Sequence, residues 1–136
     1  MEESIRAAFD LKKKDPKGYS PLTLAYVGDS VYELVIRTRI VENAARSLKS
    51  MNAEDASLAR ATTQAGMLAA IEPLLTDEEA EICRRGRNAS PESRAKHASM
   101  AEYRMATGFE ALIGYLYLSG EEERLLELIK AGWSNI

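Results

Sequence analysis

One long apolar run, from Leu22 to Val41, constrains the fold more than any other stretch of this chain. Just before it, Ser20 can cap a helix, and Pro21 suits the first helical position because no backbone N–H is needed there. Apolar residues then recur at helical spacing, at Leu24, Val27, Val31, Leu34, Val35, Ile40 and Val41. The pattern predicts a helix over about residues 21–42.

Two residues interrupt the apolar character of this run. Gly28 costs about 1 kcal/mol relative to alanine in a helix interior, which indicates that another backbone or a ligand packs closely there. Asp29 is a charge in a segment that otherwise looks buried, so it needs a cation, a metal or several hydrogen bonds. A second apolar helix, ending near Leu118, also carries an acid beside a glycine, at Gly108 and Glu110. Convergence of the two carboxylates would suit a hard cation such as Mg²⁺.

The remaining pattern is helical as well. No stretch alternates polar and apolar residues, so we expect an all-α single domain over residues 1–136. A helical region over about 52–75 should break near Thr62-Thr63 or Gly66. Three residues stand three positions before a glutamate, the spacing of a capping box at a helix start: Thr76, Ser99 and Ser119. Two glycines are expected to end the helices before them: Gly86 and Gly132.

Composition bounds the class of protein. The chain has 136 residues, a net charge of −3 and a single cysteine, Cys83. One cysteine forms no internal disulfide, and we find neither a signal peptide nor a membrane span, so we expect a cytoplasmic protein without membrane contact. An acidic chain does not favour nucleic-acid binding. Residues 84–104, however, carry six basic and only two acidic residues.

Taken alone, the candidate site residues allow two interpretations. Asp29 and Glu110 are either metal ligands or ordinary acids, each neutralised by an arginine or by backbone groups. The arginines near residue 85 either contact phosphates or complement the dipole at a helix end. The residues in question are Arg84, Arg85 and Arg87, with Lys96 further along the chain.

Both acidic stretches resemble the motifs of a known family. Residues 24–33, LAYVGDSVYE, are similar to the signature helix of the ribonuclease III family, and residues 109–114, FEALIG, to its second acidic motif. The likeness is greatest to the Mini-III branch, whose members consist of a catalytic domain alone. The resemblance implies the ribonuclease III endonuclease-domain fold, a homodimer paired through the long helix, and no double-stranded-RNA-binding domain.

The resemblance also implies an activity. Asp29 and Glu110 would be catalytic ligands of Mg²⁺ in an endoribonuclease that cleaves double-stranded RNA and leaves 5′-phosphomonoesters. The implied substrate is the 23S ribosomal RNA precursor. Arg84, Arg85 and Arg87, together with Lys96, would bind the RNA, which suits a duplex because A-form RNA is recognised by shape and phosphates.

The sequence departs from the standard family pattern at two positions. Ala25 and Thr107 stand where standard members carry further carboxylates, and the Mini-III branch lacks them too. Thr107 could hydrogen-bond a water at the metal. Glu33, one turn after Asp29, either orients a group around the metal or forms a surface ion pair with Arg37. The missing acids motivate an alternative, a non-catalytic RNA-binding or ribosome-assembly module, and the acidic net charge a third, a helical dimerisation module.

Overall fold

The computed structural model describes residues 1–44, 46–89, 99–134 and 136. Within these ranges all regular structure is helical, which confirms the predicted all-α class. None of the helices in this part of the chain is long and apolar enough to cross a membrane. The elements in chain order are α1 (Glu2–Ala8), the 3₁₀ turn η1 (Pro16–Gly18), α2 (Pro21–Ala44), α3 (Leu48–Ala59), α4 (Ala61–Ile71), the 3₁₀ turn η2 (Glu72–Leu74), α5 (Asp77–Asn88), α6 (Met100–Leu118) and α7 (Glu122–Trp133).

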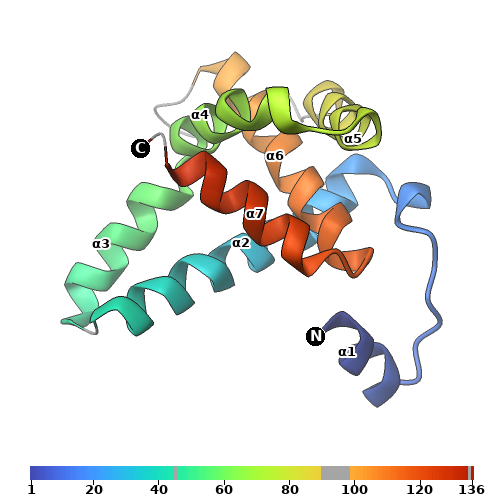
Figure 1. The fold of residues 1–136 in the computed structure, drawn as a ribbon, viewed down its shortest axis with the longest axis horizontal. Coiled ribbons are helices and arrows are strands. Elements are labelled where there is room, and N and C mark those ends of the chain that lie inside the picture. Colours follow the sequence, from blue (N-terminus) through green and yellow to red (C-terminus); the bar gives the residue numbers. More distant parts are fainter. Residues whose placement is uncertain (45, 90–98, 135) are drawn as a thin grey trace.

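Helix α6 is the centre of the fold, because α2, α4, α5 and α7 all pack against it (Figure 1). Two glycines bring α2 and α6 into backbone contact. A Cβ added to Gly28 would lie 1.8 Å from the carbonyl oxygen of Glu110, and one added to Gly114 would lie 1.9 Å from that of Leu24. The close backbone approach predicted at Gly28 is therefore confirmed, and the second acidic helix is its partner.

A second pair of glycines joins α5 to α6. A Cβ on Gly86 would lie 2.8 Å from the Cα of Gly108, and one on Gly108 would lie 2.8 Å from the carbonyl oxygen of Cys83. The prediction that Gly86 ends its helix is wrong, because α5 continues to Asn88. The glycine is needed for close packing of two helices, which looks the same in sequence as a helix stop.

Two of the three predicted capping boxes are confirmed, at Thr76 and Ser99. The third is wrong: Ser119 ends α6 and does not cap α7. Gly120, with φ of 76°, provides the left-handed turn at that point. Its N–H donates to Tyr117 (3.1 Å), and that of Glu121 donates to Leu116 (2.9 Å), which is the hydrogen-bond pattern of a Schellman motif.

Two further helix boundaries differ from the prediction. Helix α7 runs past Gly132 to Trp133, and a Cβ on Gly132 would lie 3.0 Å from Met67, so this glycine also serves packing. The break in the region over 52–75 lies at Arg60, which separates α3 from α4 with extended backbone angles. It therefore comes before the predicted break at residues 62–66.

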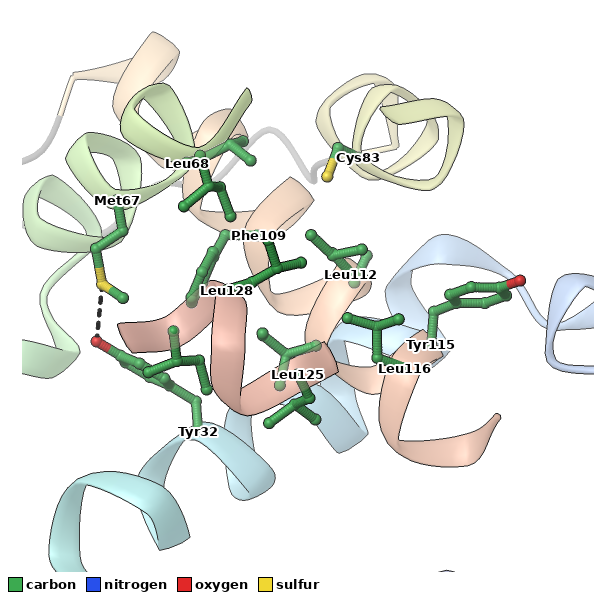
Figure 2. Close-up of a cluster of buried hydrophobic side chains, with 14 of the residues drawn as sticks. Tyr32, Met67, Leu68, Cys83, Phe109, Leu112, Tyr115, Leu116, Leu125 and Leu128 are labelled. Atoms are coloured by element: carbon green, nitrogen blue, oxygen red, sulfur yellow. Dashed lines mark hydrogen bonds between the residues drawn. The ribbon is translucent and has the colours of Figure 1, made fainter. Parts of the chain in front are cut away.

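The core lies between α2, α4, α6 and α7, and Figure 2 shows its central side chains. Tyr32 and Phe109 meet edge to face with ring centroids 5.3 Å apart. The Tyr32 hydroxyl lies 3.1 Å from the sulfur of Met67 (Figure 2) and accepts a hydrogen bond from the indole N–H of Trp133 at 3.1 Å. Cys83 is buried, which raises the pKa of its thiol to about 12. It is therefore a core residue and not a nucleophile.

Candidate active site

Asp29 and Glu110 line one open cavity of about 220 Å³ between α2 and α6. The backbone contact at Gly28 explains why they meet. It presses α2 against the carbonyl group of Glu110, and Asp29 is the next residue along α2. The rest of the lining comes from the same two helices: Leu22, Ala25, Tyr26, Tyr103 and Thr107.

The surroundings of Glu110 change the pKa of its carboxyl group. Burial raises the pKa of Glu110 to about 8, and Asp29 contributes in the same direction because its carboxylate lies within hydrogen-bonding reach. Among the residues that the structure describes, no arginine or lysine lines this cavity. Two converging acids without a cation of their own fit a bound positive ion.

The donor set is small. In the described ranges no three residues among His, Cys, Asp and Glu come together as a metal cluster, so the cavity offers the carboxylates of Asp29 and Glu110 alone. Mg²⁺ is commonly held by one or two carboxylates and keeps several waters. The residues present therefore fit a single hard divalent cation with open positions for water and phosphate oxygens.

Thr107 and Ala25 complete the floor of the cavity, at the positions where standard family members are expected to have acids. Thr107 is buried, and its hydroxyl donates a hydrogen bond to the carbonyl oxygen of Tyr103 at 3.0 Å. The oxygen can still accept a hydrogen bond from a water in the cavity. Its role near a metal stays a prediction.

Glu33 does not line this cavity. It accepts a hydrogen bond from Nε of Arg37 at 3.2 Å, so the expected ion pair one turn along α2 is present. Arg37 also reaches Asp55 of α3, with 3.4 Å between Nη2 and Oδ2. Burial, and then the carboxylate of Asp55, raise the pKa of Glu33. A further role of Glu33 at the metal stays a prediction.

Sequence reasoning missed two buried polar residues near this region. Asp55 is 9% exposed, and its Oδ1 finds no hydrogen-bond partner in the described part of the chain. Gln64 of α4 is 2% exposed, and its side chain interacts with Glu110. A lone amide within the apolar stripe of α4 was the available signal for Gln64. Nothing comparable marks Asp55, which stands among other polar residues.

The predicted RNA-binding arginines lie on α5 and each contacts an acceptor within the chain. Arg84 pairs with Glu81 (2.8 Å) and Arg87 with Glu72 (3.3 Å); both pairs are solvent-exposed and therefore weakly held. Arg85 donates to the carbonyl oxygen of Tyr19 (3.5 Å), just before α2. Lys96 lies outside the described residues. RNA contact by these side chains stays a prediction.

A larger cavity, of about 710 Å³, lies between α2 and α7. Its lining is mainly apolar and includes Leu34, Val35 and Trp133, with Glu42 as its one acid. It therefore does not bring two carboxylates together, and it offers no comparable ligand set. The smaller cavity, which brings two carboxylates together, is therefore the candidate active site.

Comparison with known proteins decides the family. Residues 22–121, which include both acidic motifs, match the model of the Ribonuclease III domain. The chain belongs to the ribonuclease III family. It is 42% identical over 121 residues to the Mini-ribonuclease 3 of Symbiobacterium thermophilum, covering 89% of this chain and 93% of that protein. The Mini-ribonuclease 3 of a Thermoanaerobacter species is 43% identical over 134 residues, covering 96% and 94%.

A solved structure shares the fold of this chain. A crystal structure of a protein from Fusobacterium nucleatum superposes with a TM-score of 0.82 at 29% identity, covering 90% of this chain and 98% of that one. The predicted ribonuclease III fold and the likeness to the Mini-III branch are thus confirmed. The matched range also contains the glycines of the α2–α6 contact, so the geometry of the cavity lies within the family domain.

Proposed function

We propose that this ribonuclease III-family chain is a Mg²⁺-dependent endoribonuclease that cleaves double-stranded RNA. The single observation that carries the proposal is the convergence of Asp29 and Glu110, from helices far apart in sequence, in one open cavity that has no cationic side chain from the described part of the chain. Membership in a ribonuclease family and the likeness to proteins named Mini-ribonuclease 3 support it. The raised pKa of Glu110 supports it as well.

Asp29 and Glu110 would hold the metal, which when bound supplies positive charge to attract the scissile phosphate and to activate a water for attack. Asp29 is exposed, whereas Glu110 is partly buried on α6. Glu110 would hold the metal as a carboxylate, without the proton that its raised pKa favours. The oxygen of Thr107 accepts a hydrogen bond from a water beside the two acids. The water oxygen forms the new bond to phosphorus, the bond to O3′ breaks, and O3′ takes up a proton. The products carry a 5′-phosphate and a 3′-hydroxyl.

The proposed substrate is duplex RNA, and more specifically the 23S ribosomal RNA precursor that the resemblance implies. Close packing at Gly86 and Gly108 holds α5, which carries the arginines, directly against α6. Helix α6 is one of the two helices that line the cavity. Arg85 also contacts the segment that leads into α2, next to the cavity residue Leu22. Positive side chains flanking an acidic site suit a polyanion whose phosphates are spread over a helix.

We further propose that the active form is a homodimer in the cytoplasm. Tyr26, which lines the cavity, is 80% exposed, so its ring lies on the surface of this chain and is open to a partner. Leu22, Leu34 and Val41 of the same helix are 42%, 50% and 52% exposed. A second copy packed along α2 would cover these apolar side chains and would set two cavities against one duplex.

The test is cleavage of a long RNA duplex. The protein is incubated with duplex and Mg²⁺, and the reaction is repeated with EDTA and with Asp29→Asn. We expect Mg²⁺-dependent cleavage that falls at least about 10³-fold in the variant, because an electrostatic group at the reacting phosphate is lost. Glu123→Gln, an exposed acid at the start of α7, is the control and should keep full activity.

Other outcomes distinguish the alternatives. Duplex binding without cleavage, unchanged by EDTA, would favour the non-catalytic RNA-binding or ribosome-assembly module. The observation that favours this alternative is that positions 25 and 107 carry no carboxylate. Dimerisation with neither binding nor cleavage would favour a dimerisation module.

A further inference from the structure

Tyr103 lines the same cavity as the two acids, from the start of α6. Thr107 follows it after four residues and Glu110 after three more. Residues at these spacings lie along one face of a helix, and all three line the cavity between α2 and α6. Tyr103 is half-buried, so it belongs to the wall of the cavity and not to the core.

The backbone of Tyr103 is held on a rigid element. Its N–H donates to the carbonyl oxygen of Ser99, the capping residue of α6, at 2.9 Å. Its own carbonyl oxygen accepts the hydrogen bond from the Thr107 hydroxyl at 3.0 Å. The capping box between Ser99 and Glu102 secures the same turn. A side chain on such a helix is positioned more precisely than one on a loop.

The hydroxyl of Tyr103 differs from those of the buried tyrosines. Tyr32 donates to the carbonyl oxygen of Leu58 at 2.8 Å, and Tyr115 donates to Glu78. Within the described ranges, the Tyr103 hydroxyl has no hydrogen-bond partner of this kind. A phenol O–H that is not used inside the chain and belongs to a residue lining an open cavity is available to a ligand.

The cavity is rich in acceptors and poor in donors. The carboxylates of Asp29 and Glu110 only accept hydrogen bonds when charged. The hydroxyl proton of Thr107 is already donated to a backbone carbonyl, and the two aliphatic lining residues offer no polar side-chain group. Of the described lining residues, only Tyr26 and Tyr103 therefore keep an unused side-chain O–H. Tyr26 is 80% exposed and lies on the proposed dimer face, which leaves Tyr103 as the donor of the wall.

A phosphodiester that enters this cavity brings non-bridging oxygens, which carry its negative charge and accept hydrogen bonds. The two carboxylates alone would repel it, and the metal that they would hold offsets this repulsion. Tyrosine is one of the side chains that proteins use to contact phosphate oxygens. A neutral phenol suits this place because it donates a hydrogen bond and does not compete with a cation for the carboxylates.

We propose that the hydroxyl of Tyr103 donates a hydrogen bond to a non-bridging oxygen of the scissile phosphate and holds this phosphate beside Asp29 and Glu110. The inference rests on the proposed function, because only a chain that cleaves RNA would bind a reacting phosphate in this cavity. It adds a contact to the substrate from α6 and leaves the two metal ligands as they are.

The test is cleavage of a long RNA duplex by Tyr103→Phe, which removes the hydroxyl and keeps the ring. At saturating RNA and Mg²⁺ we expect kcat to fall about 10- to 100-fold, the scale of one hydrogen bond to a charged group. KM should stay within about twofold of wild type, because duplex affinity is spread over many phosphate contacts. Titration of MgCl₂ without RNA and thermal unfolding should both match wild type, since no hydrogen bond within the described chain is lost.

Tyr117→Phe is the matched control, because it makes the same change on the same helix. Tyr117 is also half-buried, but it lines a different cavity, beside Glu2 and Ile5 of α1. Tyr117→Phe should keep the wild-type kcat.

Three results would overturn the inference. If Tyr103→Phe keeps the wild-type kcat, its hydroxyl does not contact the reacting phosphate, and the nuclease proposal stands. A fall in kcat that comes with weaker Mg²⁺ binding or a lower melting temperature would mean that Tyr103 supports the structure of the site instead. If the wild-type protein itself cleaves no duplex, the nuclease proposal fails and this inference fails with it.

Discussion

Two carboxylate pairs lie along the same face of α2, and they differ in what neutralises them. Glu33 and Asp55 share Arg37, which donates to both at 3.2 and 3.4 Å. Asp29 and Glu110 converge in an open cavity that no cationic side chain of residues 1–44, 46–89, 99–134 and 136 lines. The first pair is a structural ion cluster between α2 and α3. The second pair is also one aspartate and one glutamate, but no described arginine lies between them. It is the pair that we expect to bind a metal.

The difference shows how a functional acid pair can be recognised. Close carboxylates alone are not decisive, because both pairs raise the pKa of one member, Glu33 or Glu110. The presence or absence of an internal cation separates them. Three predictions follow in order of decreasing effect: the first two test this contrast, and the third tests the arginines beside the site.

The largest expected effect is on the pH dependence of stability. Because the folded protein raises the pKa of Glu110 from 4.5 to about 8, the stabilising effect of its proton is fully present below pH 4.5 and is lost as pH rises toward 8. Without metal, wild type should lose a few kcal/mol over this window from this group, at about 1.4 kcal/mol per pKa unit. Glu110→Gln should not lose it.

Urea unfolding in EDTA at pH 5 and pH 8.5 measures this difference. Mg²⁺ should restore wild-type stability at pH 8.5 and have little effect on Glu110→Gln. Equal pH dependence in both proteins would show that Glu110 is not the strained member of the cavity and would remove the contrast between the two acid pairs.

A smaller effect is expected at the neutralised pair. Arg37→Met removes the cation and leaves Glu33 beside Asp55, whose Oδ1 already finds no partner in the described residues. We expect a loss of about 1–3 kcal/mol in the free energy of unfolding at pH 7, the usual cost of an unsatisfied buried polar group. Chemical unfolding measures it, and calorimetry should show Mg²⁺ affinity unchanged. Weakened Mg²⁺ binding would mean that the two pairs work as one site.

The smallest effect concerns the arginines of α5. Arg85→Ala and Arg87→Ala should each weaken duplex binding by less than about tenfold and reduce the slope of log affinity against log salt by about one, because each removes one phosphate contact. Fluorescence anisotropy over a salt series measures both quantities. Lys130→Ala, an exposed lysine at the end of α7, serves as the control. An unchanged slope for both arginine variants would remove them from the RNA-binding surface.

The sequence allowed the main pair of acids to be predicted for a physical reason. The unfavourable glycine beside Asp29 marked a place where two backbones meet, because Gly28 packs on α6. The glycine beside the second acid, Gly108, packs against α5 instead, and Gly114 completes the α2–α6 contact. Local rules also identified the capping boxes at Thr76 and Ser99, since these depend on neighbouring residues alone.

Other features could not be predicted because they depend on tertiary packing. A glycine that ends a helix and one that packs against another helix look alike in sequence, and the latter role applies at Gly86 and Gly132. The burial of Asp55 and Gln64 depends on the angle between α3 and α4, which is set at the single residue Arg60. No periodicity within either helix encodes that angle.

The contact at Gly28 and Gly114 limits which substitutions can alter the spacing between α2 and α6. Where no side chain separates two helices, the thickness of the main chain itself fixes their spacing. Repacking nearby core residues can tune the melting temperature and leave the gap between the acids untouched. Adding one methyl group at either glycine would wedge the helices apart and change stability and ion affinity in a single step.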